Sequence, residues 1–151
     1  MRFAIARDVA LLAARVGIGV VFVAHGWQKF ATWGMDGTAT SFAQMGVPMP
    51  QVSAWFAATV ELVGGAALVL GAAVPVFGVL LAFVMAGALV IVHAGSGIFV
   101  DQGGFELVLA LGAGALVLAA VGAGRWSLDA LVAPRLAQVP ERTPERTPER
   151  V

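Results

Sequence analysis

The hydrophobic and polar positions divide the chain into four long apolar stretches, separated by segments rich in glycine, proline or charge. Each stretch is close to the about 20 residues that an α-helix needs to cross the hydrocarbon core of a bilayer. No alternating strand pattern occurs, and lipid offers no partner for exposed backbone groups. The predicted spans are residues 9–30, 52–73, 75–93 and 104–122. The pattern therefore predicts an all-α integral membrane protein, an antiparallel four-helix bundle.

The connections and their charges predict an orientation. Residues 31–51 contain three glycines, Pro48 and Pro50, and are expected to form a long loop. Positive residues near the ends of membrane helices collect on the cytoplasmic side. In this chain they lie before the first span and after the last, at Arg2, Arg7, Arg125 and Arg135. Four spans return the chain to its starting side, so both ends are expected in the cytoplasm (N-in/C-in).

The residues after the last span predict a surface helix and a tail. Residues 127–136 are amphipathic, with Ser127 as a helix N-cap and Trp126 as an anchor at the level of the lipid headgroups. Residues 137–151 contain Pro-Glu-Arg repeats, a polar, proline-punctuated composition that is typical of disorder. We therefore expect a transmembrane domain over residues 1–136 and a disordered cytoplasmic tail over residues 137–151.

Composition narrows the class of protein further. Hydrophobic residues make up 60% of the chain and charged residues only 12%, against about 25% charged residues in a soluble domain. So few charges cannot cover a soluble surface, which indicates a multi-pass membrane protein surrounded by lipid. The net charge of zero argues against a nucleic-acid partner. Without cysteine there are no disulfides or thiolate metal sites, so redox chemistry would require a bound cofactor, a quinone or a partner protein.

Glu61 is the most informative polar residue inside a predicted span. Its neighbours three and four positions away are all small, and small residues mark the face on which membrane helices approach one another. They are Ala57, Ala58, Gly64 and Gly65. Glu61 is therefore expected to point into the bundle, where a carboxylate needs a cationic partner or a proton. The available cations are Lys29, His25, His93 and Arg15.

The predicted topology places several titratable groups at similar depth in the outer half of the membrane. Ionisable groups at membrane depth cost about 2.5–3.5 kcal/mol each, which makes them functional candidates. We assign candidate catalytic roles to Glu61, His25 and Lys29. Candidate cofactor-binding roles go to His25, His93, Glu106 and Trp27.

Three chemical uses and one structural use remain open for these groups. A polar outer cavity could hold a quinone head group, with a histidine donating to its carbonyls and Glu61 relaying a proton. Haem ligation is a weaker hypothesis, because two isolated histidines are little evidence for it. Histidines and carboxylates could also hold a metal, although no zincin motif is present and no metal ligand is assigned. The structural alternative is an ion-pair network that fixes helix register.

An ordered set of motifs over residues 7–132 resembles the DoxX family, small four-helix bacterial membrane proteins. The motifs are His25-Gly-Trp-Gln-Lys29, Gly46-Val-Pro-Met-Pro50, Glu61-Leu-Val-Gly-Gly65, Gly103-Gly-Phe-Glu106 and Gly122-Ala-Gly-Arg-Trp-Ser-Leu-Asp129. The resemblance implies a plasma-membrane protein linked to redox metabolism. Some relatives look like membrane subunits of a thiosulfate:quinone oxidoreductase. In mycobacteria a relative is associated with a superoxide dismutase and a thiosulfate sulfurtransferase.

The resemblance and the polar residues together lead to three hypotheses on function. The first is a membrane subunit that supports redox metabolism or oxidative-stress defence, with a quinone site in the outer half of the bundle. The second is a non-catalytic scaffold that recruits soluble redox proteins. The third is a transporter of small solutes, with Glu61 as its coupling residue. Assembly into a homo-oligomer is compatible with each of them.

Overall fold

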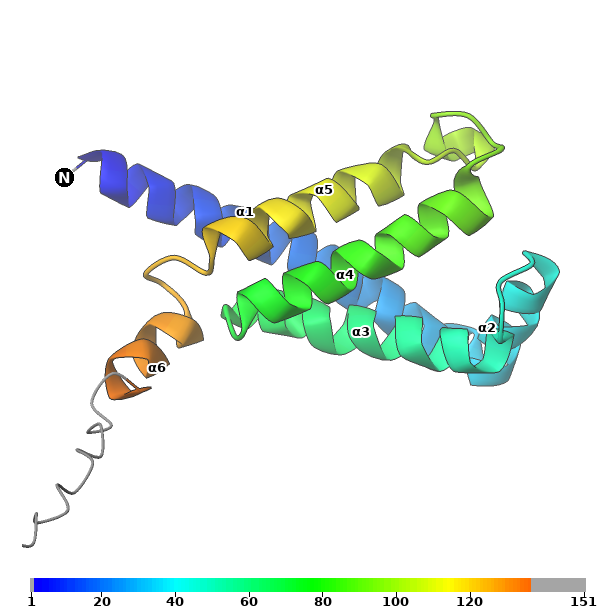
Figure 1. Ribbon diagram of the computed structural model, residues 1–151, viewed down its shortest axis with the longest axis horizontal. Helices are drawn as coiled ribbons and strands as arrows, with labels where there is room; N and C mark the ends of the chain where they lie inside the picture. Colours follow the sequence, from blue (N-terminus) through cyan, green and yellow to red (C-terminus); the bar gives the residue numbers. More distant parts are fainter. Residues whose placement is uncertain (1, 137–151) are drawn as a thin grey trace, which may run out of the picture.

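The computed structural model describes residues 2–136, and the tail predicted for residues 137–151 lies outside them. The described chain is all-helical, as predicted (Figure 1). Its six α-helices are α1 (Arg2–Trp27), α2 (Gly34–Gln44), α3 (Pro50–Leu70), α4 (Val74–Ala88), α5 (Glu106–Val121) and α6 (Leu128–Leu136). Two π-helical turns, η1 (Gln28–Thr32) and η2 (Leu89–His93), extend α1 and α4, and η3 (Val100–Gln102) is a short 3₁₀ turn.

Three of the described helical segments are long and apolar enough to cross a membrane. They are Phe3–Thr32, Pro50–Leu70 and Val74–His93. The helix α5 is also apolar but has only 16 residues, about 24 Å at 1.5 Å per residue, which is shorter than the hydrocarbon core. A fourth crossing by α5 therefore stays a prediction, and so do the four-helix bundle and the cytoplasmic position of both ends.

The long helices associate as two pairs, α1 with α3 and α4 with α5. Glycine allows backbones to approach closely in each pair. A Cβ atom added at Gly19 of α1 would lie 2.7 Å from the carbonyl oxygen of Gly65 in α3, and one at Gly78 of α4 would lie 2.7 Å from that of Ala115 in α5. The two pairs meet along α3 and α4 and diverge toward the end that carries α2 (Figure 1).

The structure corrects the long loop predicted for residues 31–51. This segment contains part of η1 and the eleven-residue helix α2. Its glycines and prolines favoured a loop, but Pro48 and Pro50 both follow the end of α2, and Thr38 and Ala39 on α2 are buried against its neighbours. Contacts with α3 and η1 therefore stabilise a helix that its glycine content disfavours. The first helix also begins at Arg2 and not at Val9.

The segment after α5 returns to the end of the molecule where α1 begins. Arg15 donates from Nη2 to the carbonyl oxygen of Trp126 at 2.6 Å. The Asp129 carboxylate accepts the backbone N–H groups of Ala73 and Val74, at 2.7 and 3.1 Å, in the turn between α3 and α4. The predicted N-cap of α6 is confirmed, because Ser127 Oγ accepts the N–H of Ala130 at 3.2 Å. These contacts hold α6 against the end of the bundle.

Candidate functional site

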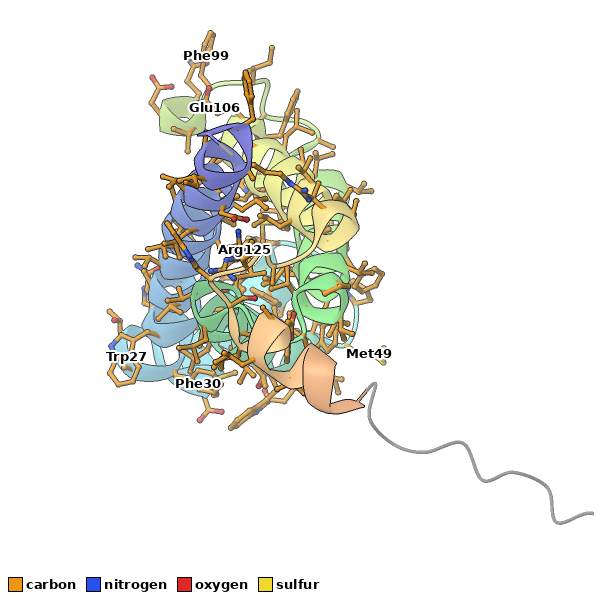
Figure 2. The ribbon with its side chains drawn as sticks, turned by 90° about the vertical axis from the view of Figure 1, so that its left-hand side faces the viewer. Trp27, Phe30, Met49, Phe99, Glu106 and Arg125 are labelled. Atoms are coloured by element: carbon orange, nitrogen blue, oxygen red, sulfur yellow. The ribbon has the colours of Figure 1, made fainter. Side chains whose placement is uncertain are left out.

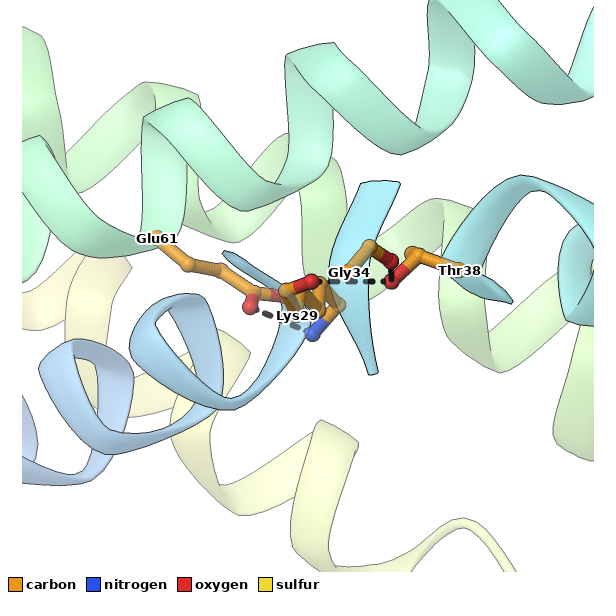
Figure 3. A network of polar contacts seen from close by, with 4 residues as sticks. All are labelled: Lys29, Gly34, Thr38 and Glu61. Atoms are coloured by element: carbon orange, nitrogen blue, oxygen red, sulfur yellow. Dashed lines mark hydrogen bonds and ion pairs between the residues drawn. The ribbon is translucent and has the colours of Figure 1, made fainter. Parts of the chain in front are cut away.

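A buried ion pair joins η1, the continuation of α1, to α3 near the end that carries α2. Lys29 Nζ lies 2.5 Å from Glu61 Oε2, and the two side chains are only 11% and 5% exposed (Figure 3). Removing both charges from water is costly, and the cost is recovered only when the two charges meet in good geometry. Of the cations available to Glu61, the structure therefore selects Lys29.

The small residues around Glu61 explain why its side chain can point inward. Ala57, Ala58, Gly64 and Gly65 are all buried with Glu61 on α3, as the sequence predicted. At the same level, a Cβ added at Gly26 of α1 would lie 2.5 Å from the backbone nitrogen of Leu62. The two backbones are thus nearly in contact beside the pair, which shields it from lipid and water.

The π-helical turn η1 positions the lysine. Lys29 lies within η1, where the wider winding interrupts the end of the helix, a feature that occurs often at functional sites. The fully buried Thr38 of α2 holds this turn, since its hydroxyl is 2.9 Å from the Gly34 carbonyl oxygen and 3.2 Å from that of Lys29 (Figure 3). Sequence reasoning missed both η1 and Thr38. The only signal was a threonine inside a glycine-rich segment.

Two other candidates lie close to the pair along α1. His25 is half-buried and lies one helical turn before Lys29, on the same face of the helix. Trp27 is exposed at the last position of α1 and lies at the edge of the molecule (Figure 2). The geometry thus groups His25 with Lys29 and Glu61, and places Trp27 on the outer surface beside them.

His93 and Glu106 do not join this group, so the single cluster expected from the sequence divides into two. His93 Nδ1 is 2.6 Å from the Gly103 carbonyl oxygen, and Glu106 Oε1 accepts the Val100 N–H at 2.8 Å. Both side chains thus hold the loop between α4 and α5. Glu106 lies across the molecule from Trp27 (Figure 2). The two groups are separated because the two helix pairs diverge. The sequence indicates how deep each residue lies along its helix, but it does not show this divergence.

A shallow apolar groove lies on the exposed face of α3, and neither Lys29 nor Glu61 lines it. It has a volume of about 510 Å³ and is lined by Gln51, Val52, Trp55, Phe56, Thr59 and Val60. The Trp55 ring packs edge-on against Phe30, the residue after Lys29, with ring centroids 5.7 Å apart. Sequence reasoning did not find this groove. Within residues 2–136, no group of three or more histidines and carboxylates is placed to hold a metal ion.

Comparison with known proteins agrees with this architecture. The family model of DoxX matches residues 10–94. Inner membrane protein YphA of Escherichia coli (strain K12) is 33% identical over 132 residues, which cover 84% of this chain and 93% of that protein. The Bacillus subtilis (strain 168) protein named Putative oxidoreductase CatD is 36% identical over 85 residues, 56% of this chain and 60% of that protein. No solved structure matches the chain. The chain is therefore a multi-pass protein of the plasma membrane that belongs to the DoxX family.

Proposed function

We propose that this protein is the membrane subunit of a redox system and that the Lys29–Glu61 pair is the centre of its quinone site. The observation that carries the proposal is the burial of this pair between two membrane helices. A membrane protein rarely retains ionisable groups at such depth without a use for them. The name of one relative, Putative oxidoreductase CatD, supports the choice of redox chemistry over transport.

The pair can do proton chemistry without leaving a net charge in the membrane. When the proton of Lys29 Nζ is transferred to Glu61 Oε2, 2.5 Å away, both groups become neutral. Lysine exchanges its proton readily when buried. The pair can thus offer either a hydrogen-bond donor or a proton to a ligand beside it. His25, half-buried one turn away, connects the pair to the surface as a second donor or acceptor.

The donors and the groove fit the chemical needs of a quinone. Its head group requires hydrogen-bond donors for the carbonyl oxygens and a nearby proton source, and Lys29 and His25 are groups of this kind. The lipid-like tail would lie along the exposed apolar face of α3, where the ring of Trp55 packs against Phe30. When bound, the quinone would supply the electron-carrying chemistry. In this proposal Glu106 and His93 serve the loop between α4 and α5.

The proposal includes a topology of four crossings with both ends in the cytoplasm. The contacts of Arg15 with Trp126 and of Asp8 with Arg125 support it. They bring the residues after α5 back to the first half of α1, which requires α5 to run toward that end. With this orientation the Lys29–Glu61 pair lies in the outer half of the membrane. Soluble redox proteins would supply or accept the electrons on either side.

The proposal is tested by native mass spectrometry of the protein extracted in mild detergent from its own membrane. The wild type is expected to retain a mass that matches a quinone, and Glu61→Gln is expected to lose it. Glu106→Gln is the matched control, because it makes the same chemical change in the other helix pair and should keep the quinone. The double variant Lys29→Met/Glu61→Met removes the site while leaving no buried charge unpaired, so it should fold and bind no quinone.

Two outcomes would argue against the proposal. If the wild type carries only lipid, or if the double Met variant still retains a quinone, the pair is not the site. If soluble proteins accompany a wild type that has no bound quinone, the scaffold hypothesis gains instead.

A further inference from the structure

A second cavity lies at the opposite end of the molecule, between the start of α1 and the segment that follows α5. It has a volume of about 260 Å³ and is lined by Ala4, Arg7, Asp8, Gly124, Arg125 and Ala130. Figure 2 views this end and shows Arg125 near its centre. Sites for drug-sized ligands measure about 300–1,000 Å³, so this cavity suits a small polar group and not a whole cofactor.

The lining of this cavity is positive. Arg7 is exposed, and the Arg125 side chain is 77% exposed although it faces the buried Asp8. Asp8 Oδ1 accepts the backbone N–H of Arg125 at 3.5 Å, and its Oδ2 lies 4.0 Å from Arg125 Nε. Asp8 therefore holds Arg125 in place and offsets one of the two positive charges. The remaining charge favours an anion at this position.

The length of α1 places Arg7 at the depth of lipid phosphates. The apolar segment Phe3–Thr32 has 30 residues, roughly 45 Å, which exceeds the about 30 Å of the hydrocarbon core. Its first residues must then reach the headgroup region when Lys29 and Glu61 lie near the other face. Trp126, half exposed beside Arg125, is the kind of residue that anchors at this level.

The orientation of α6 points to lipid as the neighbour of this end. Its polar contacts face the bundle, with Asp129 on the α3–α4 turn and Ser127 donating to the Gly124 carbonyl oxygen at 2.6 Å. Among residues 128–132, the part of α6 whose side chains are described, the exposed ones are apolar: Leu128, Leu131 and Val132. A helix at a water-facing surface would show the opposite pattern. The exposed face of α6 is suited to the acyl chains of the leaflet, next to the positive cavity.

We propose that the cavity between α1 and the Gly124–Ala130 segment binds the phosphate of an anionic phospholipid, held by Arg7 and Arg125. Asp8 positions Arg125, and α6 contacts the acyl chains of the same leaflet. The site is separate from the Lys29–Glu61 pair, so it does not depend on the proposed quinone chemistry. Lipids of net negative charge should bind more strongly than zwitterionic lipids with the same chains.

The test is native mass spectrometry of delipidated protein titrated with dioleoyl phosphatidylglycerol or dioleoyl phosphatidylcholine. The wild type should retain phosphatidylglycerol preferentially, and Arg7→Gln/Arg125→Gln should lose that preference, by about fivefold for each arginine removed. Arg7→Gln alone changes an exposed residue and should show the about fivefold loss of a single arginine without affecting folding. Arg142→Gln/Arg146→Gln makes the same change of net charge elsewhere in the chain and should keep the preference.

Three results would overturn the lipid site. They are equal retention of the two lipids by the wild type, an unchanged preference in Arg7→Gln/Arg125→Gln, and an equal loss in Arg142→Gln/Arg146→Gln. Displacement of bound phosphatidylglycerol by millimolar inorganic phosphate would also count against it, because the site would then be specific for a free anion and not for a leaflet lipid.

Discussion

Two buried cations of the first apolar segment, Phe3–Thr32, differ sharply in their surroundings. Lys29 lies at one end and meets a carboxylate, Glu61, at 2.5 Å. Arg15 lies in the other half of the helix, is only 1% exposed, and donates from Nη2 to the backbone oxygen of Trp126. Its Nε and Nη1 atoms have no hydrogen-bond partner among the described residues. One buried charge thus contacts a countercharge directly, whereas the other has a carbonyl oxygen as its only hydrogen-bond partner among the described residues.

This difference in surroundings suits the Lys29–Glu61 pair to proton chemistry and Arg15 to a structural role. Arginine keeps its proton under all ordinary conditions, whereas a buried lysine can release it. The Lys29–Glu61 pair can therefore pass a proton between its members, while Arg15 stays a fixed positive charge at the end where arginines gather. Arg15 instead ties the segment after α5 to the helix that begins the chain. The proposed proton exchange therefore belongs to the end of the molecule that carries α2.

The largest predicted effect comes from removing one member of the Lys29–Glu61 pair and leaving the other in place. Lys29→Met leaves Glu61 as an uncompensated buried carboxylate, which should lower the free energy of unfolding by about 3–5 kcal/mol. Lys29→Met/Glu61→Met removes both charges and should restore most of that loss. Denaturant unfolding in one detergent measures both variants. A double variant as unstable as Lys29→Met would mean that packing, and not charge compensation, holds this site.

The next effect concerns the space around Arg15. A Cβ at Gly71 would collide with Arg15 Nη1, and Gly71 has a φ of +70°, which L side chains rarely adopt. Gly71→Ala should therefore lower the free energy of unfolding by about 1–3 kcal/mol. Gly17→Ala on α1 is the control, since nothing lies within 4 Å of its added Cβ, and it should be neutral or stabilise by about 0.5 kcal/mol. Equal thermal midpoints for the two variants would contradict the tight fit of Arg15.

The smallest effect tests whether α2 supports the pair. Thr38→Val removes a buried hydroxyl that bonds the Lys29 and Gly34 carbonyl oxygens, which should cost about 1 kcal/mol and speed amide hydrogen exchange in η1. Thr40→Val is a matched control on the same helix, because the exposed Thr40 hydroxyl bonds only the Asp36 carbonyl oxygen. If Thr40→Val speeds exchange in η1 as much as Thr38→Val does, the specific role of Thr38 is refuted.

Sequence reasoning predicted the parts of the fold that depend on hydropathy. The apolar stretches predicted the long helices, and the small neighbours of Glu61 predicted that its side chain points inward. Both predictions were possible because each pattern lies within a single helix. The helix α2 and the turns η1 and η2 could not be predicted, since contacts from other elements decide them. Thr38 illustrates the point, because its partners Lys29 and Gly34 lie in the segments that it stabilises.

The composition of the site was only partly predictable for the same reason. Depth along each helix placed His25, Lys29, Glu61, His93 and Glu106 at one level, and depth is readable from a sequence. Position around the bundle is not, because it depends on how helix pairs cross and diverge. The structure therefore keeps the Lys29–Glu61 pair and uses His93 and Glu106 to hold a loop.

The most direct test of the central claim is infrared difference spectroscopy of the membrane-embedded protein on addition of a water-soluble ubiquinone analogue and its reduced form. If the Lys29–Glu61 pair handles protons for a quinone, reduction should change the band of a protonated carboxylic acid. That change should vanish in Glu61→Gln and persist in Glu106→Gln. A spectrum without a carboxylic acid signal would contradict the assignment of the Lys29–Glu61 pair as the redox-linked site. A carboxylic acid signal that stays unchanged in Glu61→Gln would contradict it as well.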